Sequence, residues 1–361
     1  MLYIDNTGKF FPSNNQDDAF TQKVYDLVQK WDAGESSFCI ETSGSTGNPK
    51  QITISRSQII ASIETTQSAF DLAPGDCIFC CLHTSYIAGM MMVFRARHLK
   101  LDLYVVPPST QPIDNQVFER LNQKKYKQKL FFAFVPMQLQ YILEDELARK
   151  IVNNAKAILV GGAPISTLLQ EKISQFTFPI WATYGMTETV SHVAIQAYSP
   201  VFFPYFTALP GVQVRQNEEG CLEIHSKMSG DNWLVTNDLV EMWAENSFRI
   251  VGRKDQVINS GGVKIPLGKI DVEIGNWFAT NGISHRFFAW GEPDDVLGQR
   301  LVVYVEAQQP PGTIADFWAF ASQRLKTYEK PKEWICISPF KETPTAKIDK
   351  NKTVEYARNS R

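Results

Sequence analysis

The densest run of hydroxyl-bearing residues and glycines in the chain is Glu41-Thr42-Ser43-Gly44-Ser45-Thr46-Gly47-Asn48-Pro49-Lys50. Apolar runs on either side, at residues 37–40 and 52–54, read as strands, so we expect this stretch to be the loop of a hairpin. Glycines leave backbone N–H groups uncovered, and the hydroxyls and the Lys50 ammonium add further donors. A loop of this composition is suited to a polyphosphate.

The P-loop of nucleoside triphosphatases is the nearest alternative. That motif places glycine directly before the lysine and Ser or Thr directly after it, and a helix begins at the loop. Here Pro49 precedes Lys50 and Gln51 follows it. A proline also disfavours helical geometry at the residue before it. A strand–loop–strand hairpin therefore fits better than a P-loop, and an ordinary polar turn stays open at this point.

Length and composition bound the class of protein. A chain of 361 residues predicts two or more domains, and 44% hydrophobic with 20% charged residues is typical of globular proteins. A net charge of -2 argues against a nucleic-acid partner held by bulk electrostatics. We see no run of membrane-spanning length and no secretory signal pattern. Six cysteines lie mostly in apolar runs, so we expect buried thiols in a cytoplasmic protein without membrane insertion.

Strand-like and helix-like runs alternate over the first half of the chain. The strand-like runs are 78–82, 101–106, 130–135, 157–160 and 180–184, and the helix-like runs are 16–31, 59–63 (starting at Ser55 or Ser57), 87–98, 114–124, 137–147 and 166–176. This alternation predicts an α/β fold whose large N-terminal domain has a mostly parallel sheet flanked by helices. Ligands of such sheets bind beyond the carboxyl ends of the strands.

Two further segments directly follow predicted strands. These segments are Gly161-Gly162-Ala163-Pro164 and Tyr184-Gly185-Met186-Thr187-Glu188. Their small residues would let a flat ring approach the backbone, and Glu188 adds a carboxylate suited to magnesium where a triphosphate binds. An ordinary turn capped by Ser166 is the alternative for the first segment, and a first-turn helix acid is the alternative for Glu188. The three segments together favour a nucleotide site.

The pattern changes after about residue 200. Prolines break the alternation, and shorter strands follow at 221–225, 233–236 and 247–251. Charges and glycines gather between Gly252 and Ile265. We place the boundary there, so that residues 1–254 form the large domain and residues 255–361 a small, mobile α+β domain able to fold alone. Its helices are expected at 269–279 and 314–325, and its strands at 286–290, 301–306 and 334–338.

Taken in order, these motifs make the chain resemble the superfamily of adenylate-forming enzymes, which includes acyl-CoA synthetases, peptide-synthetase adenylation domains and luciferases. The loop, the Tyr-Gly-Met-Thr-Glu segment, the Gly252-Arg253-Lys254-Asp255 run and Lys347 carry the resemblance, which covers nearly the whole chain. It implies ATP, Mg²⁺, coenzyme A and a small carboxylic acid as ligands. By this likeness ATP would meet Thr42, Ser43, Gly44, Ser45, Thr46, Gly47 and Lys50 at its phosphates, Gly161, Gly162, Ala163, Pro164, Tyr184, Gly185 and Met186 at adenine, and Asp238 and Arg253 at the ribose.

The same resemblance assigns the remaining roles. Thr187 would contact the α-phosphate, and Glu188 would hold the magnesium ion. Lys347 would be the catalytic lysine of the first half-reaction, and Asp255 the hinge between the domains. The pantetheine channel would be lined by Ser260, Gly261 and Gly262.

Within the superfamily the chain looks most similar to the o-succinylbenzoate–CoA ligases of menaquinone synthesis, through the stretch 81–95. Tyr86 stands where many relatives have histidine. Arg95 would bind a second carboxylate of the acid, or would merely pair within the structure or cap its helix. Ser191 and His192 would line the acyl pocket, with a satisfied helix residue as the alternative for His192.

The activity implied is an ATP-dependent acid–CoA ligase that forms an acyl-adenylate and then a thioester. Another aryl- or acyl-CoA synthetase, an enzyme that loads a separate carrier protein and a non-catalytic adenylate-binding module stay open. Three departures from the family pattern are a shorter stretch before the loop, Ala346 before Lys347 and Asn237 before Asp238. The first leaves the architecture and a homo-oligomeric assembly open.

Overall fold

A computed structural model describes residues 1–11, 19–42, 50–123, 129–342 and 348–360 of the protein. Its strands form one 13-stranded sheet, one five-stranded sheet and a two-stranded hairpin. The strands are β1 (Leu2–Ile4), β2 (Phe10–Phe11), β3 (Ser37–Thr42), β4 (Lys50–Ser55), β5 (Cys77–Cys80), β6 (Asp102–Val105), β7 (Leu130–Phe134), β8 (Ala155–Val160), β9 (Ile180–Met186), β10 (Ser191–Ser199), β11 (Phe206–Ala208), β12 (Gln213–Gln216), β13 (Cys221–His225), β14 (Trp233–Ala244), β15 (Ser247–Arg253), β16 (Val257–Ser260), β17 (Val263–Pro266), β18 (Phe287–Asp294), β19 (Gly298–Val305) and β20 (Trp334–Cys336).

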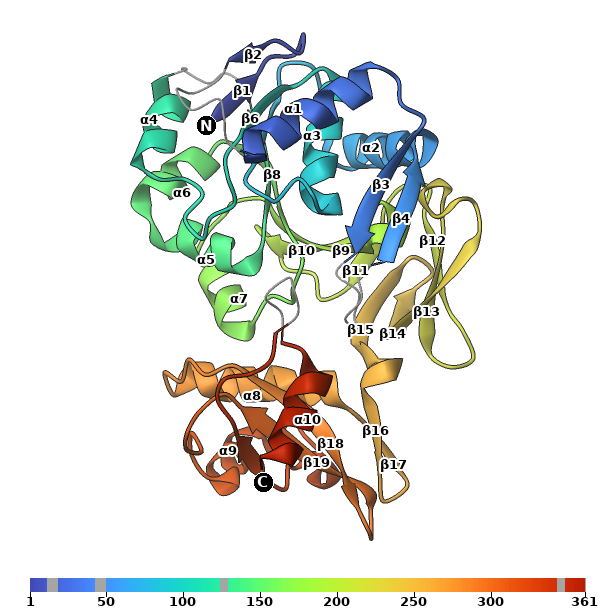
Figure 1. The fold of residues 1–361 in the computed structure, drawn as a ribbon, viewed down its shortest axis with the longest axis vertical. Coiled ribbons are helices and arrows are strands. Elements are labelled where there is room, and N and C mark those ends of the chain that lie inside the picture. The colour runs from blue at the N-terminus through green and yellow to red at the C-terminus, as the bar shows by residue number, and fades with distance from the viewer. Residues whose placement is uncertain (12–18, 43–49, 124–128, 343–347, 361) are drawn as a thin grey trace.

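The helices lie mainly between the strands of the first half and around the small C-terminal sheet (Figure 1). They are α1 (Ala19–Asp32), α2 (Arg56–Phe70), α3 (Ile87–Leu99), α4 (Asn115–Gln123), α5 (Pro136–Glu144), α6 (Glu146–Val152), α7 (Thr167–Ile173), α8 (Leu267–Thr280), α9 (Ile314–Ala321) and α10 (Lys350–Asn359), with short 3-10 turns that include η1 (Thr187–Thr189) and η3 (Lys254–Gln256).

Five strands in the order β6-β5-β7-β8-β9 run parallel at the centre of the large sheet. Alternate residues of each strand enter opposite cores: Phe132 packs with helices α4 to α7, and Phe131 packs with α1 and α3. Burial on both faces explains why these strands read as continuous apolar runs. The α/β class with a helix-flanked sheet is confirmed, although the sheet as a whole is mixed, because every strand beyond β9 and beyond β6 pairs antiparallel.

Most predicted elements of the large domain are confirmed, one predicted helix is wrong, and five strands were not predicted, among them β1, β2, β11 and β12. The predicted hairpin exists, since β3 and β4 pair antiparallel from Ser37↔Ser55 to Thr42↔Lys50. Ser55 is the residue that caps α2, and it forms a capping box with Gln58. The single helix expected over 137–147 is wrong: α5 ends before Asp145, whose side chain accepts from the Ala148 N–H and starts α6. Strand β10 was not predicted.

Helix α3 lies at the centre of the large domain. Every residue from Gly89 to Ala96 is buried, because one face packs with α1 and the parallel strands while the other packs with α2, β10 and the β3–β4 hairpin. A helix that is buried all round carries apolar residues on every face. The one charged residue in that buried stretch is Arg95.

The smaller C-terminal domain has a core of its own, confirming that part of the predicted fold. Residues of α8, α9, β18, β19 and β20 surround the stacked rings of Trp277 and Trp334. The chain leaves the 13-stranded sheet at Arg253, passes through η3 and enters the five-stranded sheet at Val257. Figure 1 shows the C-terminal elements, orange to red, gathered on one side of this junction. The boundary at Asp255 stays a prediction.

Four of the six cysteines are buried, while Cys39 is exposed and Cys336 half-buried. Cys80 and Cys81 enter opposite cores of the large sheet, as strand alternation predicts. Within the described ranges, no helix has both the length and the apolar character needed to cross a bilayer.

Candidate nucleotide and acid site

The two segments predicted to hold adenine lie side by side. Strands β8 and β9 are parallel neighbours with Val160 opposite Ala182, and the Thr183 hydroxyl donates to the Val160 carbonyl at 3.2 Å. A Cβ at Gly161 would lie 2.5 Å from that hydroxyl oxygen, so a larger residue there would require the Thr183 side chain to shift. The exposed residues 162–164 follow at the carboxyl edge of the sheet, where such folds bind ligands.

A hydrogen-bonded network joins the adenine segment to the predicted ribose and hinge residues. The Tyr184 hydroxyl donates to Asp238 Oδ2 at 2.6 Å, and Arg253 Nη1 donates to Asp238 Oδ1 at 3.1 Å. The remaining arms of Arg253 donate to both oxygens of Asp255 at 2.9 and 2.8 Å. Burial and the charge of Asp238 raise the pKa of Tyr184, so its hydroxyl stays a donor at neutral pH. Tyr184 is only 8% exposed, and its contact with adenine stays a prediction.

The turn after β9 sends the chain back as β10. Thr189 closes the turn, because its hydroxyl contacts the backbone of Met186 and Ser191. Val190 is buried with φ at +61°, a conformation that is strained for a β-branched residue. At Gly185 a Cβ would lie 2.0 Å from the Ser191 carbonyl oxygen. Only glycine lets the two strands approach this closely.

Arg95 is a buried cation that pairs with no carboxylate among the side chains described by the structure. It is 2% exposed, donates to Ser191 Oγ at 3.2 Å and to Met92 Sδ at 3.9 Å, and its Nε has no partner. No ion pair with it occurs among the described side chains, which do not include that of Glu41, whereas Arg97, two residues on, pairs with Asp32. Burial lowers the pKa of Arg95 to about 10, so it stays charged at neutral pH. The helix-cap alternative is wrong, since α3 is capped by Lys100.

His192 continues the polar cluster from Arg95 toward α2. It lies on strand β10, so the alternative of a helix residue is wrong. Its Nδ1 is 3.2 Å from Ser191 Oγ, and its Nε2 is 3.3 Å from Thr66 Oγ1. Burial, together with the nearby charge of Arg95, holds the pKa of His192 well below its usual value. The imidazole is therefore neutral at pH 7. Sequence reasoning missed Thr66, because a threonine in a helix gives no signal of a partner 126 residues away.

Other predicted residues lie apart from this cluster. Tyr86 is 43% exposed at the start of α3, beside the His83 ring and about 13 Å from Arg95 along the helix axis. Ser260 ends β16, and Gly261 and Gly262 form its two-residue turn into β17, both with positive φ. Positive φ at both central residues is the geometry of a type I′ turn.

Several of the predicted site residues lie outside the described residues. They are Ser43, Gly44, Ser45, Thr46, Gly47 and Lys347. The strand backbones at Thr42 and Lys50 are paired where the predicted phosphate loop begins and ends. An isolated bridge between Glu342 and Ile348 likewise brings together the residues on either side of the tail segment.

The described residues contain no group of three His, Cys, Asp or Glu side chains able to hold a metal ion by themselves. Glu188, in η1 directly after β9, is exposed and forms no ion pair within that part of the chain. Magnesium commonly binds through one or two carboxylates plus substrate phosphates. A single carboxylate beside the predicted nucleotide site fits that mode. The absence of a three-ligand group excludes a cage made of described side chains.

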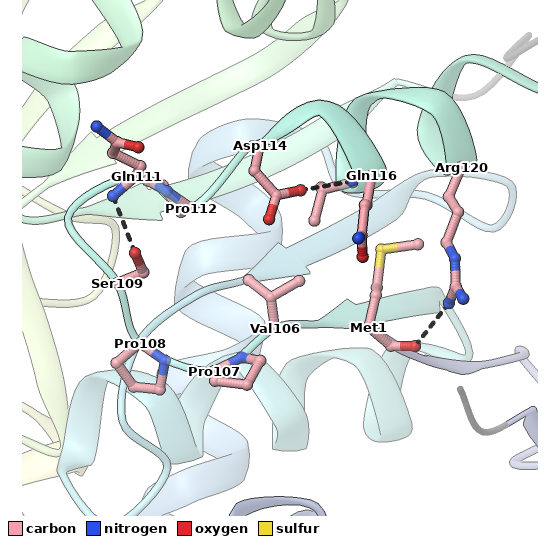
Figure 2. A pocket seen from close by; sticks show the side chains of 11 residues that line it. Met1, Val106, Pro107, Pro108, Ser109, Gln111, Pro112, Asp114, Gln116 and Arg120 are labelled. Atoms are coloured by element: carbon pink, nitrogen blue, oxygen red, sulfur yellow. Dashed lines mark hydrogen bonds between the residues drawn. The ribbon is translucent and has the colours of Figure 1, made fainter. Parts of the chain in front are cut away.

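A cavity of about 490 Å³ lies elsewhere, at the end of β6 and the start of α4 (Figure 2). Met1, three prolines and Arg120 contribute to its lining, and the Met1 carbonyl accepts from Arg120. None of the predicted site residues lines it, so the candidate site is distinct from this cavity.

Comparisons with known proteins agree with the motifs. The chain is similar to 2-succinylbenzoate–CoA ligases from Listeria monocytogenes, at 23% identity over 92% of this chain and 73% of that protein, and Enterococcus faecalis, at 24% identity over 88% and 69%. It is 38% identical to an acyl-CoA synthetase (AMP-forming)/AMP-acid ligase II-like protein from Dyadobacter fermentans, whose solved structure matches 99% of this chain and 100% of that one with a TM-score of 0.62.

The Bacillus subtilis O-succinylbenzoate coenzyme A synthetase, solved with ATP and magnesium, shares the fold. It matches 88% of this chain and 69% of that one, with a TM-score of 0.73 at 18% identity. The AMP-binding enzyme family matches residues 5–220, which is more than half of the chain. The chain therefore belongs to the AMP-binding enzyme family, within the adenylate-forming superfamily that its motifs resemble.

Proposed function

We propose that the protein is an ATP-dependent acid–CoA ligase that acts on 2-succinylbenzoate. Family membership and the relatives' names support the reaction class. The observation that carries the substrate is the buried Arg95 cation, which has no carboxylate partner among the described residues. A buried unpaired charge is costly, so its presence is best explained by an anionic ligand that completes the site.

The position of this cation suits the proposed acid. Its partner Ser191 lies directly opposite Met186 in the β9–β10 pairing, and Met186 ends the segment assigned to adenine. The acid pocket would therefore adjoin the nucleotide. An aromatic acid with two carboxylates would present one to the α-phosphate and the other to the guanidinium, which binds carboxylates through paired N–H donors.

In the first half-reaction the acid carboxylate attacks the α-phosphorus of ATP, and pyrophosphate leaves. Charge on the phosphoryl oxygens must be neutralised. The loop 42–50, Thr187 and the Lys347 ammonium supply donors for it, and a magnesium ion held at Glu188 would supply additional positive charge. Asp238 and Arg253 would orient the ribose.

In the second half-reaction the thiol of coenzyme A attacks the acyl-adenylate carbonyl, and AMP leaves. One surface cannot easily present both the Lys347 ammonium and a thiol channel to the same carbon. We propose that the domain 255–361 turns about Asp255 and exchanges the lysine for the channel beside Ser260, Gly261 and Gly262. Movements of this kind use a few residues that absorb backbone rotation.

The test of the function is a panel of carboxylates assayed for ATP-dependent thioester formation. We expect 2-succinylbenzoate to give the highest kcat/KM, and Arg95→Ala to remove its advantage over plain benzoate. Arg97→Ala is the matched control, because this arginine lies on the same helix but pairs with Asp32. An unchanged ratio in Arg95→Ala would remove Arg95 from the pocket. Failure of every acid to drive ATP–pyrophosphate exchange would favour a non-catalytic adenylate-binding module instead.

A further inference from the structure

Four side chains from three elements form one row behind the proposed acid pocket, and all but the half-buried Ser191 are buried. Arg95 of α3 contacts Ser191 of β10, His192 follows Ser191, and Thr66 of α2 contacts the far side of the imidazole. Thr66 is fully buried and also donates to the Ser62 carbonyl one helical turn earlier, at 2.9 Å. This hydrogen bond from Thr66 to the Ser62 carbonyl determines which group donates and which accepts in every other hydrogen bond of the row.

A threonine hydroxyl has a single hydrogen. Because Thr66 gives that hydrogen to the Ser62 carbonyl, its oxygen can only accept from His192, whose Nε2 must then carry the ring hydrogen. The neutral ring leaves Nδ1 as an acceptor for the Ser191 hydroxyl. The Ser191 oxygen is thus left to accept from Arg95.

The opposite tautomer would satisfy fewer groups. With the hydrogen on Nδ1, Ser191 would receive N–H groups from both His192 and Arg95, and Thr66 would have to abandon the Ser62 carbonyl to serve Nε2. The 2.9 Å distance to Ser62 is shorter than the 3.3 Å distance to His192, which favours the first arrangement. Buried hydrogen bonds in a row of this kind also strengthen one another.

We propose that Thr66 is a positioning residue of the acid pocket. By accepting from Nε2 of His192 it sets the imidazole tautomer, and through Ser191 it holds the Arg95 guanidinium in the orientation that receives the second carboxylate of the acid. The effect on the acid rests on the proposed function, whereas the tautomer does not.

The tautomer is measured on the whole protein labelled with ¹⁵N-histidine, by long-range ¹H–¹⁵N correlation spectra. The chain has five histidines, and His192→Gln identifies the signal of interest. We expect a ring protonated at Nε2 in the unaltered protein and in Thr66→Ser, and a shift toward Nδ1 protonation in Thr66→Val. Thr65→Val is the matched control, because it makes the same change one residue away on α2, outside the row.

The kinetic arm uses the same variants. Thr66→Val is expected to lower the kcat/KM ratio of 2-succinylbenzoate to benzoate about tenfold, equivalent to roughly 1.4 kcal/mol, and Thr66→Ser to restore it. A purely structural role would lower the activity with both acids alike.

Each other outcome is decisive. A ring protonated at Nδ1 in the unaltered protein overturns the proposal, as does a Thr66→Val ring that keeps its tautomer. A changed tautomer with an unchanged ratio of the two acids overturns the positioning role. If no acid is turned over, the proposed function fails. The imidazole spectra then still test, independently, whether Thr66 sets the tautomer of His192.

Discussion

At the scale of single residues, Arg95 has no carboxylate partner among the described side chains. Removing it distinguishes a ligand site from a structural contact. If the guanidinium served the fold, its removal would destabilise the protein. If the guanidinium instead binds an anionic ligand, the unliganded folded protein bears the desolvation cost of a buried cation. The neutral His192 beside it cannot offset that charge.

We therefore predict that Arg95→Met raises the free energy of unfolding by about 1–3 kcal/mol, while acid selectivity is lost. Methionine keeps the volume and the apolar contacts of the stem within α3. Calorimetric melting of the unliganded protein measures the change, and a lower Tm than that of the unaltered protein would show that Arg95 is structural. Stability gained at the cost of function is common at binding sites.

At the scale of elements, the site depends on how closely β9 and β10 approach. Gly185 faces His192 in the pairing, and a Cβ there would overlap the Ser191 carbonyl and lie 2.7 Å from the His192 Cα. The overlapping atoms are backbone, so they cannot move aside by a rotamer change.

We predict that Gly185→Ala pushes the start of β10 away, lowers the Tm by several degrees and lowers activity with every acid about tenfold, equivalent to roughly 1.4 kcal/mol. Gly275→Ala is the control, since this glycine lies within α8 and its Cβ would make an ordinary 3.5 Å contact with the Phe287 ring of β18. Alanine in a helix is favoured over glycine by roughly 0.5–1 kcal/mol. Near-normal melting and turnover in Gly185→Ala would contradict the close approach of the strands.

Periodicity in the sequence was sufficient to predict the alternating elements and the β3–β4 hairpin, because these depend on local patterns. The helix break at Asp145 depends on a single capping hydrogen bond, in which the Asp145 side chain accepts from the Ala148 N–H. Strand β10 begins after a left-handed valine, which no local preference anticipates. In the site, motifs indicated the strand-end segments, whereas the Thr66–His192 contact required the packing of α2 on β10.

At the scale of the whole molecule, the proposed hinge connects the two domains and the nucleotide site. Asp255 sits in η3 between the two sheets and accepts both remaining arms of Arg253, whose third contact is Asp238. Arg253 is thus shared between the proposed ribose site and the hinge. A rotation of the small domain about Asp255 would either break the Arg253–Asp255 ion pair or move both residues together.

The two half-reactions allow the hinge to be tested directly. Proline at position 255 would fix φ near −65° and restrict Lys254 before it. We predict that Asp255→Pro keeps ATP–pyrophosphate exchange but lowers thioester formation from supplied acyl-adenylate about tenfold or more, equivalent to roughly 1.4 kcal/mol. Lys347→Ala should show the reverse pattern. Asp255→Ala is the control, because it removes the same carboxylate from Arg253 but leaves the backbone free to rotate. Loss of thioester formation in both Asp255 variants would show that the defect comes from the missing carboxylate. Unchanged thioester formation in Asp255→Pro would show that the hinge is not at Asp255.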